Sequence, residues 1–309
     1  MATRFWKKKI ILFKLETVYG TDATPTGTTD AVLASNIKLT PLKTEMVTRD
    51  IEQATMGNSP NLAVASYRTI SFDVELAGSG TAGTAPKFGK LLRCAGFSEV
   101  ITAGTSVVYA PVSEAFESAT LYINIDGKLY KMWGVRGTVG FNLSAKGIPK
   151  LTFEMSGLCG PVTDTAMATV DLTGFQKPVP VNNVNTTGFA VNSFSTRLYE
   201  LQVSVAAQTV YRNLPGAEDF LVTNRQPSGS LVIEDPSVAD WDYIPLVKTA
   251  AAVPVTLTHG TVAGNKVKID LRTELGEPDP DQRDGVVVVK FPLRPVPSAG
   301  NDEIVFTFL

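Results

Sequence analysis

The chain has 309 residues, of which 28 are basic and 30 are acidic, so its formal net charge is only −2. This length exceeds what one hydrophobic core usually supports, which favours two domains. Because the charges nearly cancel, the chain has no basic field that would hold nucleic acid by its phosphates.

The cysteines and the first residues bear on where the protein is made. Cys94 and Cys159 stand among apolar residues, and we expect both to be reduced and buried. The basic and apolar run at residues 7–13 is too short for a signal peptide. No stretch is long enough to span a membrane, so we expect synthesis in the cytosol and no membrane partner.

Residues 1–35 read as an extended N-terminal arm, because a short apolar run leads into a stretch rich in Thr, Pro and Gly. We expect this arm to pack on a neighbouring copy. Strands are predicted at 37–47 and 68–76, and residues 50–65 form a long connection between them. Long loops in compact domains are usually functional. The candidates in this loop for contacts with other copies of the chain are Gln53, Met56, Asn58, Pro60 and Asn61.

Residues 78–83 match the G-x-G-x-x-G spacing of dinucleotide-binding turns. That motif requires a parallel βαβ unit, whereas the flanking pattern is antiparallel. We therefore interpret it as a flexible lead-in to a helix at 87–95, with Pro86 in its first turn, and expect no cofactor. This helix should cover one open face of the sheet.

Residues 119–155 carry the clearest strand pattern and predict four consecutive antiparallel strands. Asp126-Gly127 suits the positive φ angles of a two-residue hairpin turn, which pairs Ile123 with Tyr130 and Leu121 with Met132. Alternation then gives the sheet one apolar and one polar face. The polar face is either outer surface or the lining of a water-filled bore.

The remaining chain repeats this order. Residues 162–193 are rich in Thr, Asn, Pro and Gly and read as a linker. From residue 194 we expect a strand, a loop at 212–226, another strand and a helix at 235–251 that Pro245 kinks or breaks, followed by further strands. The matching order indicates a structural duplication.

No catalytic or metal-binding pattern emerges. His259 is the lone histidine and has no cluster of cysteine or carboxylate partners. The acidic stretch at 277–285 departs from the spacing of an EF-hand loop, so an exposed hairpin tip is favoured over a calcium site. We expect neither a metal nor an enzymatic activity.

Several stretches together resemble the major tail tube proteins of long-tailed, non-contractile bacteriophages. They are KLETVYGTD at 14–22, LTPL at 39–42, MGNSP at 56–60, FDVELAGSG at 72–80, KLLRCAGF at 90–97 and GVRG at 134–137. The resemblance covers about residues 10–160, and the second half is similar in element order only. It implies a β-sandwich with one flanking helix. Together with the repeated element order, this predicts a mainly β fold with two tandem antiparallel β-sandwich domains, at 36–161 and 194–309.

The resemblance also implies a function. Such subunits form rings whose inner sheets merge into a barrel, and stacked rings make a virion tail tube that DNA crosses during ejection without specific binding. Expected partners are further copies of the chain and the tape measure, distal tail and tail terminator proteins. Two sandwiches per chain favour a trimeric ring with pseudo-sixfold symmetry, and a hexamer is the alternative.

The competing hypothesis is a two-domain β-sandwich module that binds carbohydrate or a cell surface, but the three tryptophans are scattered rather than gathered into a platform. If the tube hypothesis holds, the polar side chains of both sheets line the lumen. The candidates are Ser71, Asp73, Glu75, Arg136, Thr138, Asn142, Thr152 and Glu154 in the first half, and Lys266, Lys268, Asp270 and Arg272 in the second.

Overall fold

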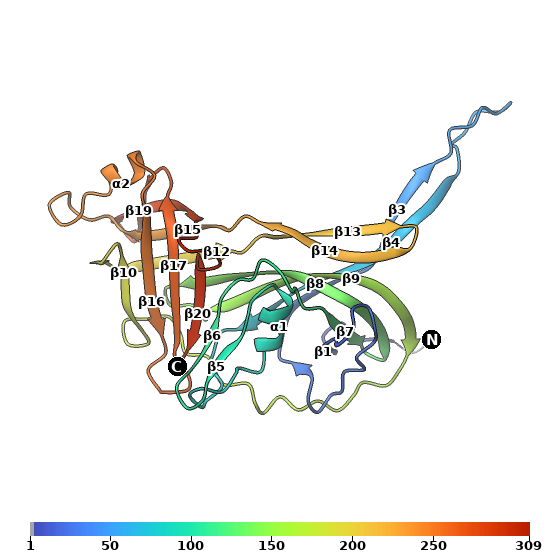
Figure 1. The fold of residues 1–309 in the computed structure, drawn as a ribbon, viewed down its shortest axis with the longest axis horizontal. Coiled ribbons are helices and arrows are strands. Elements are labelled where there is room, and N and C mark those ends of the chain that lie inside the picture. Colours follow the sequence, from blue (N-terminus) through green and yellow to red (C-terminus); the bar gives the residue numbers. More distant parts are fainter. Residues whose placement is uncertain (1–2) are drawn as a thin grey trace.

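The computed structural model describes residues 3–309 as a mainly β protein with antiparallel strands (Figure 1), which confirms the predicted fold class. Its helices in this range, α1 (Gly89–Cys94) and α2 (Ile244–Lys248), are short, and each follows a long hairpin in its half of the chain. Within residues 3–309 no helix has the length and apolar character needed to cross a membrane.

The strands divide between the two halves of the chain. The first half contains β1 (Lys9–Leu15), β2 (Ala31–Val32), β3 (Ser35–Thr48), β4 (Asn61–Glu75), β5 (Val100–Thr102), β6 (Ser106–Tyr109), β7 (Ala119–Ile125), β8 (Lys128–Ser144) and β9 (Lys150–Asp164). The second half contains β10 (Thr186–Val191), β11 (Phe194–Ser195), β12 (Leu198–Ser204), β13 (Ala207–Leu214), β14 (Ala217–Arg225), β15 (Ser228–Glu234), β16 (Ala252–His259), β17 (Val267–Leu275), β18 (Asp279–Arg283), β19 (Val286–Pro295) and β20 (Ile304–Phe308).

The β7–β8 hairpin forms as its sequence predicts. Asp126 and Gly127 both have positive φ, at 43° and 90°, as a two-residue turn of the mirror-image type requires. Ile123 pairs with Tyr130 and Leu121 with Met132, in the expected register. The turn therefore fixes which side chains of β7 and β8 enter the core.

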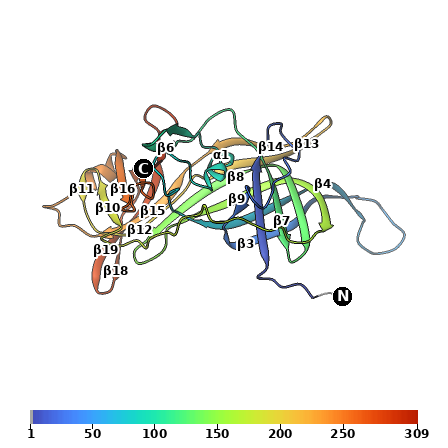
Figure 2. The same cartoon turned by 90° about the horizontal axis from the view of Figure 1, so that it is seen from below.

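One long sheet runs through both halves in the order β3, β4, β9, β8, β12, β15, β19, β18. Figure 2 shows the first-half strands β3, β4, β9 and β8 lying side by side. The halves join where residues 140–144 of β8 pair antiparallel with residues 200–204 of β12. We call this pairing the internal seam and the eight strands the long sheet.

A second layer packs against the apolar face of the long sheet. It contains β1 beside β7, and a group of strands in the order β6, β20, β17, β16, β10, of which β16, β17 and β20 stand upright at the left of Figure 1. The C-terminal strand β20 thus pairs with β6 of the first half. One buried apolar cluster extends from Ile11 to Phe308 and includes a contact between Phe141 and Phe306, whose ring centroids lie 5.4 Å apart. The two predicted sandwiches therefore share one sheet and one core.

The segment before residue 35 differs from the predicted arm. β1 pairs with β7 along its whole length, and Ile11 and Phe13 are 1% and 2% exposed. Residues 9–35 therefore belong to the body of their own chain, because the apolar run at 10–13 fills a gap in the second layer. Of the predicted arm, residues 1 and 2 lie outside the described range.

Three predicted connections also differ. β9 continues to Asp164, and β10, which begins at Thr186, pairs with β16. Only residues 165–185 of the predicted linker therefore lack helix and strand. The predicted loop at 212–226 is mostly the hairpin β13–β14. The helix expected at 235–251 is reduced to α2, which has Pro245 in its first turn because proline is tolerated only at a helix start.

Candidate functional site

The long sheet collects polar side chains on one face. Antiparallel pairing sets Ser71 opposite Glu154 and Asp73 opposite Thr152, and it sets Glu154 in turn opposite Thr138. Opposed residues point to the same side, so the alternation seen in the sequence becomes one continuous polar surface. The Thr152 hydroxyl donates a hydrogen bond to the Asp73 carboxylate at 2.8 Å.

This polar face continues across the internal seam. Asn142 lies opposite Gln202, and Gln202 lies opposite Ser230 on the next strand. A shallow hollow of about 270 Å³ straddles the seam, with side chains from both halves in its lining. The two halves therefore present one surface rather than two. Its lining includes Thr138, Asn142, Thr152, Glu154, Gln202 and Ser204.

All eight first-half lumen candidates lie on this face by their register, whereas the second-half candidates do not. Arg136 lies opposite Ser156, and its guanidinium donates hydrogen bonds to the carbonyl oxygens of Phe220 at 2.7 Å and Phe116 at 2.9 Å. Lys268, Asp270 and Arg272 lie on β17, with Lys266 just before it, in the second layer between β16 and β20. Strict alternation marks both kinds of sheet, so the sequence could not tell the layers apart. The second-half residues on the polar face that sequence reasoning missed include Gln202, Ser204, Ser230, Lys290, Asp279 and Asp281.

The hairpin β3–β4 projects beyond the body of the molecule at the upper right of Figure 1. Its five predicted loop candidates are all exposed, and Met56 is fully so. Apolar side chains on the outer half of the hairpin are exposed as well. They are Met46, Val47, Leu62 and Val64, each between 54% and 56% exposed.

The matching hairpin of the second half, β13–β14, is packed against the first half instead. Phe220 is 2% exposed, and its ring centroid lies 5.5 Å from Tyr67 and 5.1 Å from Tyr211. Its backbone N–H donates to the Tyr19 hydroxyl at 2.6 Å. Arg136 completes this anchor, because its guanidinium binds the Phe220 carbonyl and lies 4.9 Å from the centre of the Tyr19 ring.

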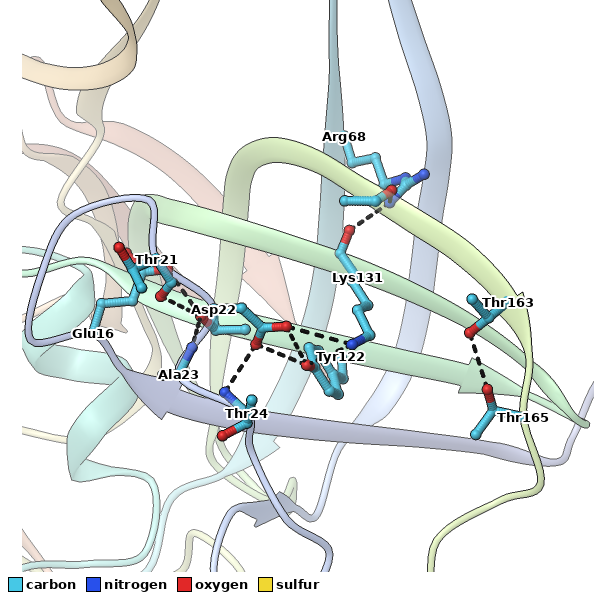
Figure 3. Close-up of polar contacts among 12 residues, drawn as sticks. Glu16, Thr21, Asp22, Ala23, Thr24, Arg68, Tyr122, Lys131, Thr163 and Thr165 are labelled. Carbon is cyan, nitrogen blue, oxygen red and sulfur yellow. Dashed lines mark hydrogen bonds and ion pairs between the residues drawn. The ribbon is translucent and has the colours of Figure 1, made fainter.

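The segment that follows β1 is fixed by two carboxylates (Figure 3). Glu16 accepts hydrogen bonds from the hydroxyls of Ser118 and Thr120 and from the backbone N–H of Gly134. Because these partners lie on β8, on β7 and just before β7, Glu16 holds residues 16–20 against the β7–β8 hairpin.

Asp22 makes the second fixed point. Its carboxylate accepts a hydrogen bond from the Tyr122 hydroxyl at 2.6 Å and pairs with Lys131 at 3.4 Å. Partial burial alone would raise the pKa of Asp22, but hydrogen bonds from Tyr122 and Thr24 and the charge of Lys131 lower it overall. The same burial and the facing carboxylate raise the pKa of Tyr122. These groups stay in their structural protonation states near neutral pH, so the cluster is an anchor.

The remaining reactive side chains have structural partners. His259 is 2% exposed, and its imidazole bonds the Val179 carbonyl at 3.0 Å and the Thr186 hydroxyl at 2.9 Å, which ties the linker to β16. Burial lowers the pKa of His259 and raises that of the Cys94 thiol, which donates to the Val135 carbonyl. Cys94 is buried as predicted, whereas Cys159 is half-buried, and neither forms a disulfide.

Other patterns noted in the sequence also have structural positions. The glycine run at 78–83 is held against the second half, where the Gly80 N–H donates to the Gly264 carbonyl at 2.9 Å. The acidic stretch forms the β18–β19 hairpin, and residues 3–309 contain no group of three or more His, Cys, Asp or Glu side chains placed to hold a metal. Trp241 stacks on Phe194, and Trp6 alone among the tryptophans is largely exposed, at 71%.

The surfaces of the molecule define a class of protein. A long polar sheet face, unpaired strand edges and a projecting hairpin are typical of a β-rich structural protein that binds other subunits. The comparison with family models gives the particular family. A model described as phage tail tube protein matches residues 6–303. The chain therefore belongs to the phage tail tube protein family. A search of curated proteins found no match.

Family membership fixes the general role. The family is one of structural virion proteins rather than enzymes, and its members assemble with themselves and other tail proteins into a tube. The protein is thus a component of a phage tail.

Proposed function

We propose that copies of this chain close into rings, and that the rings stack into a hollow tube through which DNA passes during ejection. The protein would act in the virion tail after assembly in the host cytoplasm. As the family resemblance implies, its partners would be further copies of itself and the tape measure, distal tail and tail terminator proteins. The long-tailed, non-contractile phage type follows from the same resemblance.

The observation that carries this proposal is the long sheet with its two free edges. Within residues 3–309, β3 pairs with β4 alone and β18 with β19 alone, so an unpaired edge stands at each end of the sheet. Free edges are prone to pair with other chains, and closure into a barrel removes them. Rotating copies about a common axis would join these edges and make the sheet continuous.

The internal seam supports three chains per ring. The strands β3, β4, β9 and β8 form one four-stranded unit, and β12, β15, β19 and β18 form a second unit that follows it in the same sheet. Each chain would thus contribute two units, and three chains would supply the six units of a pseudo-sixfold ring. A ring of six chains would need a barrel twice as large.

The polar face of the long sheet would line the lumen. Its lysines, such as Lys290, are matched by carboxylates such as Asp73 and Glu154, so the face offers no basic field and DNA would slide past without binding tightly. A cysteine replacing Glu154, which is exposed in the chain, tests this placement. In intact tubes, we expect a bulky thiol reagent to label Glu154→Cys slowly, and in dissociated subunits rapidly. Equal labelling rates in both states would show that this face is outside the lumen.

The hairpin β3–β4 would dock on an adjacent copy. The packed hairpin β13–β14 of the same chain provides the precedent, because it lies on the neighbouring unit through buried aromatic contacts. Exposed apolar side chains on β3–β4 would gain burial in the same way. Deleting residues 53–63 should leave a folded subunit that fails to polymerise. Normal tubes from this deletion would refute the docking role.

Electron micrographs of the purified protein test the proposed function as a whole. We expect rods or rings of uniform diameter with a central channel. Isolated particles at all protein concentrations, together with binding to a carbohydrate array, would instead support the binding-module hypothesis.

A further inference from the structure

We propose that adjacent chains join by pairing β18 of one copy with β3 of the next, and that opposite charges on these two edges select this pairing. The inference rests on the proposed ring and identifies which edges form its seams. It also explains why the ring would close head to tail instead of through a twofold contact.

The internal seam provides the geometric template. There β8, the last strand of the first unit, pairs antiparallel with β12, the first strand of the second unit. In the order of the long sheet, β18 is the last strand of the second unit and β3 is the first strand of the first unit. Repeating the template around a ring therefore places β18 beside β3 of the next chain.

The apolar side of β3 is incomplete where this contact would form. At the internal seam, the inward-facing Leu201 and Val203 of β12 are 0% and 1% exposed. On β3, Ile37 and Leu39 are only half-buried. They line an apolar groove of about 320 Å³ together with Trp6 and Tyr130. A neighbouring unit beside β3 would bury these side chains as the first half buries those of β12.

The two edges carry opposite net charges on the same face, because two lysines outnumber Glu45 on β3 and two aspartates outnumber Arg283 on β18. Arg283 is also paired with Glu200 of its own chain at 3.1 Å. Lys38 lies opposite Ser71 and Lys43 opposite Tyr67, which places both lysines on the polar face. Asp279 lies opposite Lys290 and Asp281 opposite Val288, and this register places both aspartates on that face as well. All four side chains are exposed, and within residues 3–309 none of them forms an ion pair.

This arrangement discriminates between possible contacts. Pairing β18 with β3 brings aspartates to lysines, whereas pairing two β3 edges or two β18 edges brings like charges together. Like charges across an interface oppose the wrong pairing, and a heterologous contact is the kind that generates a ring. No two opposite charges face each other across the internal seam, where Asn142 lies opposite Gln202 and Ser144 opposite Glu200, because the chain itself dictates that contact.

A zero-length carbodiimide crosslinker, which joins a carboxylate to an amine in contact, tests the seam directly. Tubes assembled from a mixture of unlabelled and ¹⁵N-labelled protein are crosslinked, digested and analysed by mass spectrometry. We expect peptides that link Lys38 or Lys43 to Asp279 or Asp281, and we expect mixed-isotope pairs because the two edges lie at opposite ends of one chain's sheet. Tubes without such links would overturn the inference.

Charge reversal gives a second, independent test. Asp279→Lys with Asp281→Lys, or Lys38→Asp with Lys43→Asp, should each raise the protein concentration needed for assembly at least about tenfold. Combining all four substitutions in one chain should restore assembly. Glu114→Lys, at an exposed acidic position outside the long sheet, is the control and should assemble normally.

The results of these tests distinguish a failure of the proposed β18–β3 seam from a failure of the proposed tube function. Normal assembly of both charge-reversed variants, or no rescue in the combined variant, would refute the charge-selected seam while leaving the tube intact. A wild-type protein that forms neither rings nor tubes would contradict the proposed function and this inference together.

Discussion

Replacing Phe220 with alanine tests whether aromatic contacts hold the hairpin β13–β14 on the neighbouring unit. Phe220 is 2% exposed and forms a three-ring cluster with Tyr67 and Tyr211. Truncating a buried phenylalanine costs about 3–5 kcal/mol. Because the hairpin forms a separate two-stranded sheet, we expect the loss as detachment of residues 207–225 and not as unfolding of the body.

Hydrogen exchange read by mass spectrometry measures this loss segment by segment. A docking free energy lowered by 3 kcal/mol corresponds to exchange faster by about a hundredfold in residues 207–225. The control Val210→Ala, at a 44% exposed position of the same hairpin, should change exchange little. The reasoning fails if Phe220→Ala leaves exchange in this segment unchanged, or if β7 and β8 accelerate equally.

Three further predictions concern stability. Glu303 is 2% exposed and pairs with Arg225, so Glu303→Ala would leave the Arg225 charge without its partner. Urea titrations should show that the free energy of unfolding falls by about 3 kcal/mol. A loss under about 1 kcal/mol would contradict this prediction. Burial lowers the folded-state pKa of His259 below its ordinary value of 6.5, so the unfolded chain binds more protons below that pH. Stability should therefore be full above about pH 6.5 and fall as the pH drops, and His259→Gln should flatten this slope; parallel curves would refute it. A Cβ on Gly137 would lie 2.2 Å from the Glu154 carbonyl oxygen, so Gly137→Ala should lower the free energy of unfolding by about 1–3 kcal/mol. Gly57 has open space around it, so Gly57→Ala should change stability little. Equal melting temperatures of the two variants would argue against this packing.

Local patterns in the sequence predicted local structure well. The turn at Asp126-Gly127 set the β7–β8 register, and strict alternation placed Ser71, Asp73, Thr152 and Glu154 on one polar face. The hairpin turn and the alternation of side chains both depend only on residues close together in the sequence, so they can be recognised from the strand and turn residues alone.

Pairings between distant segments were not predictable in the same way. Nothing in residues 140–144 indicates that β12 is their partner, and the C-terminal strand β20 gives no sign that it joins β6. The hairpin β13–β14 was not predicted because its strands flank Pro215-Gly216, a pair of residues typical of loops. The lumen candidates on β17 failed to join the polar face because outer and inner sheets alternate alike.

The number of chains per ring tests the central claim most directly. Image averaging of assembled tubes by electron cryomicroscopy, with the mass of a single ring measured in parallel, gives both symmetry and copy number. We expect three chains per ring, threefold symmetry, and two alternating sheet units that imitate a sixfold arrangement. Six chains per ring with true sixfold symmetry would contradict it.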